Sequence, residues 1–306
     1  MSFVAILFAL LLEQARPLGQ VNLVHNTNRT WVYWVVRNFD AGKPWHGGLT
    51  WSLAVLLPSL LAFCLHWFLV WTLGWVAAVI WNIAVLYATL GFRQFSHHFT
   101  RIRDALYAGD EALARQGLAE WMRMDASELP RSEIVRHVIE YSAVSAHRHV
   151  FGVLTWYCVA TAVGLGPAGA VFYRTAEYVG RLVDRPLQPT HAPLSAAFQA
   201  SANRAWYLAD WVPVRLTALG FAFVGSFEEA IDSWRQYAVA HPEDNDGIIL
   251  AATAGAIDVK LGTPQLAGDQ QVPQTTHLRA FVGLVWRTVV MWMVILVLLS
   301  LARLLG

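Results

Sequence analysis

An uncharged stretch constrains the fold of this chain more than any other feature. Residues 51–92 contain no Asp, Glu, Lys or Arg, and one membrane-spanning helix needs only about 20 apolar residues. The stretch therefore predicts a helical hairpin that turns near Thr72 to Gly74. The composition agrees, because 56% of the residues are hydrophobic and 14% are charged, whereas soluble domains carry about 25% charge.

Two further stretches predict membrane helices. Residues 150–172 are uncharged, and residues 280–302 carry only Arg287. A weaker candidate runs over residues 205–225, and it could span only if its polar groups face protein or water. These groups, with the proline beside them, are Asp210, Pro213 and Arg215. The expected number of spans is therefore four or five.

The fold class expected from these patterns is all-α: a polytopic helical membrane protein with cytoplasmic amphipathic helices. The first twelve residues lack a basic region and a cleavage site, so they predict a short retained helix that dips into the membrane. We expect a single membrane domain over residues 1–306. Its parts are a dipping helix and interfacial segment (1–48), the hairpin (49–92), a cytoplasmic helical insert (93–149), spans with a polar kinked segment (150–225), an acidic polar segment (226–278) and a C-terminal span (279–306).

The polar insert predicts folded helices outside the bilayer. Residues 93–149 contain eight Arg and eight acidic residues, and a loop rich in Arg favours the cytoplasmic side. Gly109–Asp110 interrupts a helical pattern at a place that suits a helix stop and a new N-cap. A further helix is expected after Pro130.

The acidic segment contains the sequence HPEDNDGIILAATAGAIDVKLG at residues 241–262. His241–Pro242 is expected to end an amphipathic helix, and Asn245–Asp246–Gly247 predicts a turn. A helix of small residues is expected over 250–261, closed by Gly262 as its C-cap.

Several residues are candidates for a binding site, and each has a structural alternative. Arg215 needs a partner in its apolar surroundings, for which Asp210 or Glu177 is the expected choice, so it predicts either a polar site between helices or a structural ion pair. Arg174 either marks the membrane interface or holds a phosphate or carboxylate. His241 and Asn245 could both bind a ligand, or only end a helix and form a turn.

Metal and nucleic acid are not expected as ligands. Two metal-binding side chains on one helix face need a spacing of three or four residues. The histidine pairs are instead adjacent or two residues apart: His97, His98, His147 and His149. Both cysteines, Cys64 and Cys158, lie in apolar segments, which argues against a disulfide framework. The net charge of +1 gives no indication of nucleic-acid binding.

Four sequence blocks resemble one family of integral membrane proteins, which contains the cobalamin-biosynthesis proteins CobD and CbiB and the AmpE proteins. The blocks are DALYAGDEALAR (104–115), GPAGAVFYR (166–174), DWVPVRLTAL (210–219) and the 241–262 stretch. For biosynthetic members the resemblance implies an adenosylcobinamide-phosphate synthase. Such an enzyme joins adenosylcobyric acid to an aminopropanol unit as an amide, using ATP and a divalent metal such as Mg²⁺.

The chain departs from the synthase pattern at acidic positions. In EYSAVSAHRH (140–149), Glu140 matches the pattern, but Val144 replaces a Glu and Arg148 replaces an Asp. Other departures are Ser145, His149, Glu177, Trp206, Tyr207, Asp210 and Leu250. The form of the 210–219 block resembles AmpE proteins, which are described as inner-membrane components linked to envelope sensing.

The loss of acids favours a non-catalytic or altered AmpE-like regulatory component, and the alternative is a working synthase that would use Mg²⁺ and ATP. We assign no catalytic residue and no metal ligand. The expected location is the bacterial inner membrane, with several spans. Expected partners are the lipid bilayer, a corrinoid or another amphipathic small molecule, and a membrane protein. The candidate ligand-binding residues are Glu140, Arg148, Tyr173, Arg174, Glu177, Asp210, Arg215, His241, Asn245 and Lys260.

Overall fold

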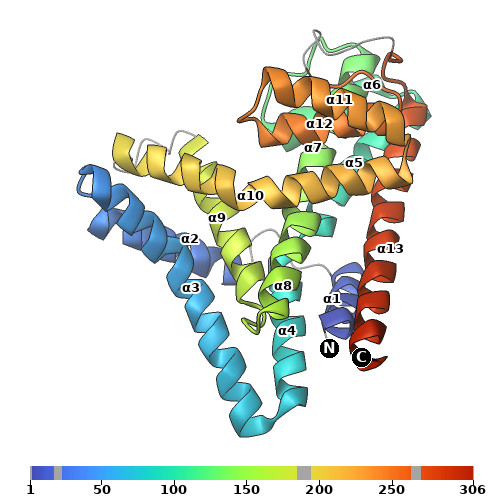
Figure 1. Cartoon of the computed structure of the whole chain (residues 1–306). Helices are drawn as coiled ribbons and strands as arrows, with labels where there is room; N and C mark the ends of the chain where they lie inside the picture. Colours follow the sequence, from blue (N-terminus) through green and yellow to red (C-terminus); the bar gives the residue numbers. More distant parts are fainter. Residues whose placement is uncertain (1, 17–22, 185–193, 263–269, 306) are drawn as a thin grey trace. The chain divides into compact units, whose positions relative to one another are not determined.

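The computed structural model describes residues 2–16, 23–184, 194–262 and 270–305. Within these ranges the chain is helical and contains no strand, apart from an isolated bridge between Val259 and Gln271 (Figure 1). This confirms the expected all-α fold. The helices are α1 (Ser2–Ala15), α2 (Leu23–Phe39), α3 (Pro44–Leu73), α4 (Trp75–Thr89), α5 (Phe92–Ala108), α6 (Glu111–Met122), α7 (Arg131–Ala146), η1 (His147–Phe151), α8 (Gly152–Ala162), α9 (Ala168–Asp184), α10 (Ala196–Val224), α11 (Phe227–Ala240), α12 (Asn245–Ala256) and α13 (Thr275–Leu305).

The helices form two compact units. The first unit comprises Met1–Gly91 and Arg148–Pro213, and the second comprises Phe92–His147 and Val214–Gly306. Two helical stretches pass from one unit to the other, namely α10 and the continuous helix formed by α7, η1 and α8.

The predicted hairpin is confirmed in the first unit. Helix α3 and helix α4 pack against each other and are joined at Gly74, whose φ of +81° favours glycine (Figure 1). Exposed tryptophans mark both ends of α3, with Trp45 near its start and Trp71 near its end. These two positions are separated by about 39 Å at 1.5 Å per residue, close to the roughly 40–45 Å of a bilayer with its headgroups.

The prediction of one membrane helix over residues 150–172 is wrong. Helix α8 ends at Ala162, and a turn leads into α9, which packs back against α8. Gly164 and Gly166 both have positive φ in this turn, and Pro167 lacks the N–H that a continuing helix would use. The absence of charge in this stretch therefore reflects burial within a helix pair.

Three helices in the described ranges are long and apolar enough to cross a membrane: Pro44–Leu73, Ala196–Val224 and Thr275–Ala302. The weaker candidate over residues 205–225 lies within the second of them, and Pro213 is accommodated inside the helix. Two further apolar helices, Phe3–Ala15 and Trp75–Thr89, are shorter. Of the four or five spans expected, three lie within helices of spanning length in the described ranges, and the chain is an all-α membrane protein.

The second unit confirms the helix boundaries expected in the polar insert. Asp110 caps α6 by accepting a hydrogen bond of 2.9 Å from the N–H of Leu113, and α7 begins directly after Pro130. Helices α5 and α6 pack against α7, and α5 and α7 also contact α13.

The expected boundaries of the small-residue helix are wrong. Helix α12 begins at Asn245 and ends at Ala256, so it includes the residues predicted to form a turn. Asp244 is its N-cap, since its side chain accepts a hydrogen bond of 3.0 Å from the N–H of Gly247. Gly262 has a positive φ but lies six residues beyond the end of this helix.

Candidate functional site

Five of the predicted site residues lie in the first unit, on three helical elements that pack into its interior. Arg148 is on η1, Tyr173, Arg174 and Glu177 are on α9, and Asp210 is on α10. Arg181, one turn after Glu177, joins them. We call these six residues the arginine cluster: Arg148, Tyr173, Arg174, Glu177, Arg181 and Asp210.

Glu177 is the best-defined anion of the arginine cluster. Its side chain is 1% exposed, and Arg181 binds both of its oxygens, with Nε 2.5 Å from Oε1 and Nη2 3.0 Å from Oε2. Arg174 donates a hydrogen bond of 3.1 Å to the same Oε2. Burial alone would raise the pKa of Glu177, but Arg181, Arg174 and Arg148 together hold it below its ordinary value. The carboxylate is therefore ionised at neutral pH.

Tyr173 and Asp210 form the second polar contact. Both side chains are fully buried, and the Tyr173 hydroxyl donates a hydrogen bond of 2.7 Å to Oδ1 of Asp210. The ring of Trp206 lies 5.4 Å from the Tyr173 ring, and the guanidinium of Arg148 lies 5.6 Å from the centre of the Trp206 ring. Trp206 thus provides an aromatic surface for both Tyr173 and Arg148.

Two glycines make room for these rings. A Cβ on Gly152 would lie 2.1 Å from the Tyr173 ring, and a Cβ on Gly180 would lie 2.9 Å from the Trp206 ring. Since real side chains do not approach so closely, larger residues at either position would displace the aromatic groups.

The arginine cluster has the chemistry of an anion-binding region. It contains three guanidinium groups and two carboxylates, and Arg presents a planar fork that matches carboxylate and phosphate oxygens. Its residues do not fit a carboxylate-held divalent cation, because Glu177 is bound by two arginines and Asp210 accepts from Tyr173. The described residues also contain no group of three or more His, Cys, Asp or Glu side chains that could hold a metal ion.

Glu140 lies in the second unit, in a separate ion-pair network. Its Oε1 accepts hydrogen bonds from the N–H of Gly262 (2.8 Å) and from Arg136 (3.1 Å), which also pairs with Glu133. His137 lies 3.6 Å from its other oxygen. Burial would raise the pKa of Glu140, but His137, the Gly262 N–H and Arg136 lower it below the ordinary value. These contacts tie α7 to the segment after α12.

Arg215 also lies in the second unit, where its Nη1 is 3.5 Å from Oδ1 of Asn245. The structure therefore brings together two predicted site residues that the sequence did not pair. The expected pairing of Arg215 with Asp210 or Glu177 would join the two units and stays a prediction.

His241 has a packing role in the second unit. Its ring stacks on Tyr237 at 4.6 Å, and the Tyr237 hydroxyl bonds to Asp244, the N-cap of α12. The Tyr237 ring also lies against Gly247, where a Cβ would lie 2.1 Å from the ring. The stretch from 241 to 247 therefore joins α11 to α12 by packing and capping, which favours the structural alternative for His241.

Lys260 is half-buried, and its backbone N–H donates a hydrogen bond of 2.9 Å to the carbonyl of Gln271. This contact adjoins the isolated bridge between Val259 and Gln271. The backbone of Lys260 thus has a structural role, whereas a ligand role for its side chain stays a prediction.

Sequence reasoning missed two arginines that organise these networks. Arg181 lies four residues after Glu177, and Arg136 lies four residues before Glu140. Oppositely charged residues at this spacing lie on one helix face. A search for such pairs would have found both arginines.

Comparison with known proteins decides the family. The family described as CobD/Cbib protein matches residues 4–281 of the chain. The chain belongs to this family. The match includes the arginine cluster of the first unit and the Glu140 network of the second.

Proteins named cobalamin biosynthesis protein CobD are similar over much of the chain. The protein from Stutzerimonas stutzeri is 32% identical over 275 residues, which cover 85% of this chain and 84% of the relative. The protein from Chromobacterium violaceum is 32% identical over 60% of this chain and 56% of its own length. The protein from Mycobacterium tuberculosis is 26% identical over 70% of this chain and 68% of its own. No solved structure matches.

These relatives change the balance between the two sequence-based hypotheses. All three carry the name CobD, which supports the biosynthetic alternative. The AmpE-like regulatory hypothesis, which we favoured from the loss of acids, finds no support among them.

Proposed function

We propose that the protein acts in cobalamin biosynthesis as an adenosylcobinamide-phosphate synthase of the CobD type. The observation that carries this proposal is the similarity to the CobD protein of Stutzerimonas stutzeri, which extends over 85% of this chain and 84% of that relative. A match of this breadth covers both compact units.

The chemistry of the arginine cluster supports an anionic substrate. Amide formation in this reaction starts from a carboxylate on the corrinoid and an amine on the aminopropanol unit. Guanidinium groups bind carboxylate and phosphate oxygens with paired hydrogen bonds. Arg148 and Arg174 are the residues that we assign to substrate binding, while Glu177 and Arg181 hold Arg174 in place.

Activation of the carboxylate at the expense of ATP is the expectation from the resemblance. The described acidic residues do not fit a metal held by several carboxylates. The proposed role of this chain's residues is therefore limited to binding and orienting the two substrates and lowering the electrostatic cost of bringing anions together.

We also propose a multi-pass location in the bacterial inner membrane. The three long apolar helices and the tryptophans at both ends of α3 support it. The Arg-rich segment from α5 to α7 is then cytoplasmic, where ATP and the corrinoid are available. A reporter fused after Asp125 should give a cytoplasmic signal, and a periplasmic signal would contradict this orientation.

Complementation tests the proposed activity. The gene is expressed in a strain that lacks its own synthase, and growth is measured on adenosylcobyric acid under conditions that require cobalamin. We expect growth with the wild-type chain and none with Arg148→Gln. Arg103→Gln is the matched control, because Arg103 forms an exposed ion pair with Asp104, and it should support growth.

Membrane extracts separate folding from function. Each variant should accumulate in the membrane at the wild-type level, as measured by quantitative immunoblot. Failure of a well-expressed wild-type chain to restore growth, together with binding of adenosylcobyric acid by the purified protein, would replace the synthase proposal by ligand binding without turnover.

A further inference from the structure

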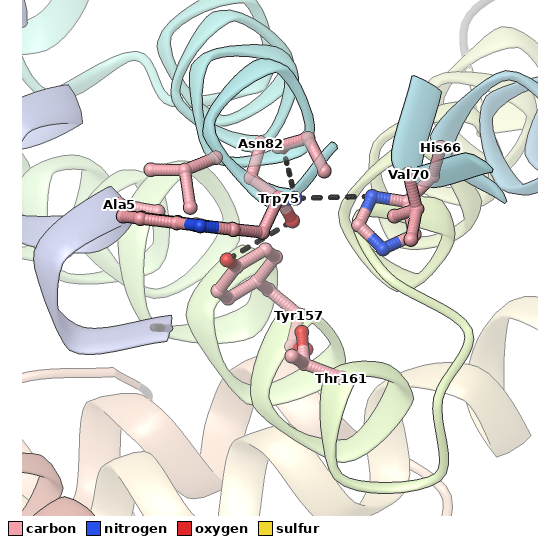
Figure 2. A pocket seen from close by; sticks show the side chains of 9 residues that line it. Ala5, His66, Val70, Trp75, Asn82, Tyr157 and Thr161 are labelled. Carbon is pink, nitrogen blue, oxygen red and sulfur yellow. Dashed lines mark hydrogen bonds between the residues drawn. The ribbon is translucent and has the colours of Figure 1, made fainter. Parts of the chain in front are cut away.

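A second set of hydrogen-bonded polar side chains lies apart from the arginine cluster. It lines a cavity of the first unit near the turn of the α3–α4 hairpin. The cavity has a volume of about 220 Å³, and a cavity needs roughly 10–15 Å³ in the same measure to hold one water molecule. It is therefore large enough for a small organic molecule. Its lining comes from α1, α3, α4 and α8, and the residues are Ala5, His66, Val70, Trp75, Ala78, Val79, Asn82, Tyr157 and Thr161 (Figure 2).

A chain of hydrogen bonds crosses one side of the cavity. The Tyr157 hydroxyl donates to Oδ1 of Asn82 over 3.1 Å. Nδ2 of Asn82 donates to the carbonyl of Ala78 over 2.7 Å and lies 3.2 Å from Nδ1 of His66. Figure 2 shows these bonds converging on Asn82.

The arrangement of these bonds assigns the tautomer of His66. An amide nitrogen has two hydrogens and no lone pair to offer, so Asn82 donates to His66 and Nδ1 of His66 accepts. In a neutral imidazole the other nitrogen then carries the hydrogen. His66 therefore presents an N–H donor at Nε2, and the bonds that occupy Asn82 and Tyr157 keep that donor in one orientation.

The position of His66 is fixed by the turn between α8 and α9. A Cβ on Gly166 would lie 2.6 Å from the His66 ring, and Gly166 has a φ of +56°. The neighbouring Trp67 donates a hydrogen bond of 3.1 Å to the carbonyl of Gly164. Two successive residues of α3, His66 and Trp67, thus contact the turn between α8 and α9.

The remaining lining is apolar and includes aromatic rings. The rings of Trp75, Tyr157 and His66 are arranged around the cavity, whereas Val70, Ala78 and Val79 add aliphatic surface (Figure 2). Flat apolar walls with one polar edge suit an apolar ring compound that carries a hydrogen-bond acceptor at its edge. Exposed apolar residues of α3 and α4 surround this region, so a molecule dissolved in the bilayer could reach it.

We propose that this cavity binds a small, uncharged, lipid-soluble ring compound whose carbonyl oxygen accepts a hydrogen bond from Nε2 of His66. The carbonyl end lies at the His66–Asn82–Tyr157 chain, and the ring lies between the aromatic walls. This inference is independent of the proposed synthase activity, because it uses none of the residues of the arginine cluster.

Menadione, a small quinone, serves as the probe in a binding experiment with the full-length protein in lipid nanodiscs. The matched hydrocarbon 2-methylnaphthalene has the same ring system without the carbonyl groups. Empty nanodiscs measure partition into lipid, which is subtracted. We expect saturable binding of menadione, with the hydrocarbon at least about fivefold weaker because it lacks the hydrogen bond.

Substitutions at His66 test the proposed donor. His66→Phe keeps a ring but removes the donor, and it should weaken menadione binding at least about fivefold while leaving the hydrocarbon unchanged. His66→Gln supplies an N–H again and should recover part of the affinity. Trp71→Phe, at a strongly exposed position on α3, is the control and should bind like the wild type.

Two results would overturn the proposal. One is binding of menadione that never saturates after subtraction of the lipid signal, since this means partition or a cavity already filled by lipid. The other is equal affinity of both probes for wild type and His66→Phe. If His66→Phe unfolds at a lower temperature, the comparison of the two probes on the wild-type protein still decides the question.

Discussion

Tyr173 and Asp210 face each other across α9 and α10, and their hydrogen bond of 2.7 Å is fully buried. A buried carboxylate loses hydration that only protein donors can replace. The bond therefore connects α9 to the part of α10 that belongs to the first unit, and it holds Asp210 beside the aromatic surface formed with Trp206. It links two residues that the sequence placed in different blocks.

Replacement of Tyr173 by Phe removes this donor while keeping the ring. We expect Tyr173→Phe to lower the free energy of unfolding by about 1–3 kcal/mol, the usual cost of removing one partner from a buried polar group. Denaturant unfolding in detergent micelles measures the loss. Tyr107→Phe is the control, because Tyr107 donates to the Thr275 carbonyl at an exposed position, and it should cost less than about 0.5 kcal/mol.

Substitution of Arg181 tests how much its ion pair with Glu177 stabilises the fold. Arg181→Lys keeps the charge but lacks the planar guanidinium that contacts both oxygens of Glu177, so we expect a loss of about 1–2 kcal/mol in unfolding free energy. Arg181→Met leaves the buried carboxylate with fewer donors and should cost about 2–4 kcal/mol. The double variant Arg181→Met with Glu177→Gln should be more stable than Arg181→Met alone. If the double variant instead loses as much stability as the single variants Arg181→Met and Glu177→Gln added together, the pair contributes no coupling.

The ion pairs of Glu140 predict how the stability of the fold depends on pH. Its pKa in the folded chain lies below the ordinary 4.5, so its ionised form stabilises the fold above that pH. This contribution is lost as the pH falls through the folded pKa. The stability difference between wild type and Glu140→Gln should therefore be present at neutral pH and shrink as the pH falls below about pH 4.5.

The control for this pH series is Glu243→Gln, because Glu243 is exposed before α12. Its stability difference from the wild type should stay within about 0.5 kcal/mol at every pH. A Glu140→Gln difference that stays the same from neutral to acidic pH would contradict the assigned ion pairs.

The sequence predicted those parts of the fold that depend on local patterns. The hairpin followed from the absence of charge in 51–92, and the cap of α6 followed from Asp110. The prediction of one helix over 150–172 failed because Gly164 and Gly166 adopt positive φ in an apolar stretch. Hydropathy does not distinguish a buried helix pair from one membrane helix, so turn residues had to be given more weight than the absence of charge.

The sequence predicted several residues of the candidate site, but it did not predict which of them contact one another. The family blocks supplied Tyr173 and Asp210, and the departures from the synthase pattern supplied Glu177; the structure brings all three into one cluster. The bond between Tyr173 and Asp210 joins positions 37 residues apart, and no local spacing encodes it. The cavity at His66 was missed because Asn82 and Tyr157 come from separate helices, and their bonds arise only when these helices pack.

Close helix contact at Gly255 explains the small residues of α12 and provides the last prediction. A Cβ on Gly255 would lie 2.2 Å from the carbonyl oxygen of Glu229 on α11. This neighbour is backbone and cannot turn aside, so Gly255→Ala should separate the two helices and lower the unfolding free energy by about 1–3 kcal/mol. The matched control is Gly283→Ala in α13, where no atom lies within 4 Å of the added group.

Alanine favours helices more than glycine by up to about 1 kcal/mol. Gly283→Ala should therefore be neutral or slightly stabilising. The unfolding free energies of Gly255→Ala and Gly283→Ala should differ by at least about 1 kcal/mol, with the lower denaturant midpoint for Gly255→Ala. Equal midpoints would mean that α11 and α12 can separate without loss. The close approach at Gly255 would then not be what requires small residues in the segment after Asp244.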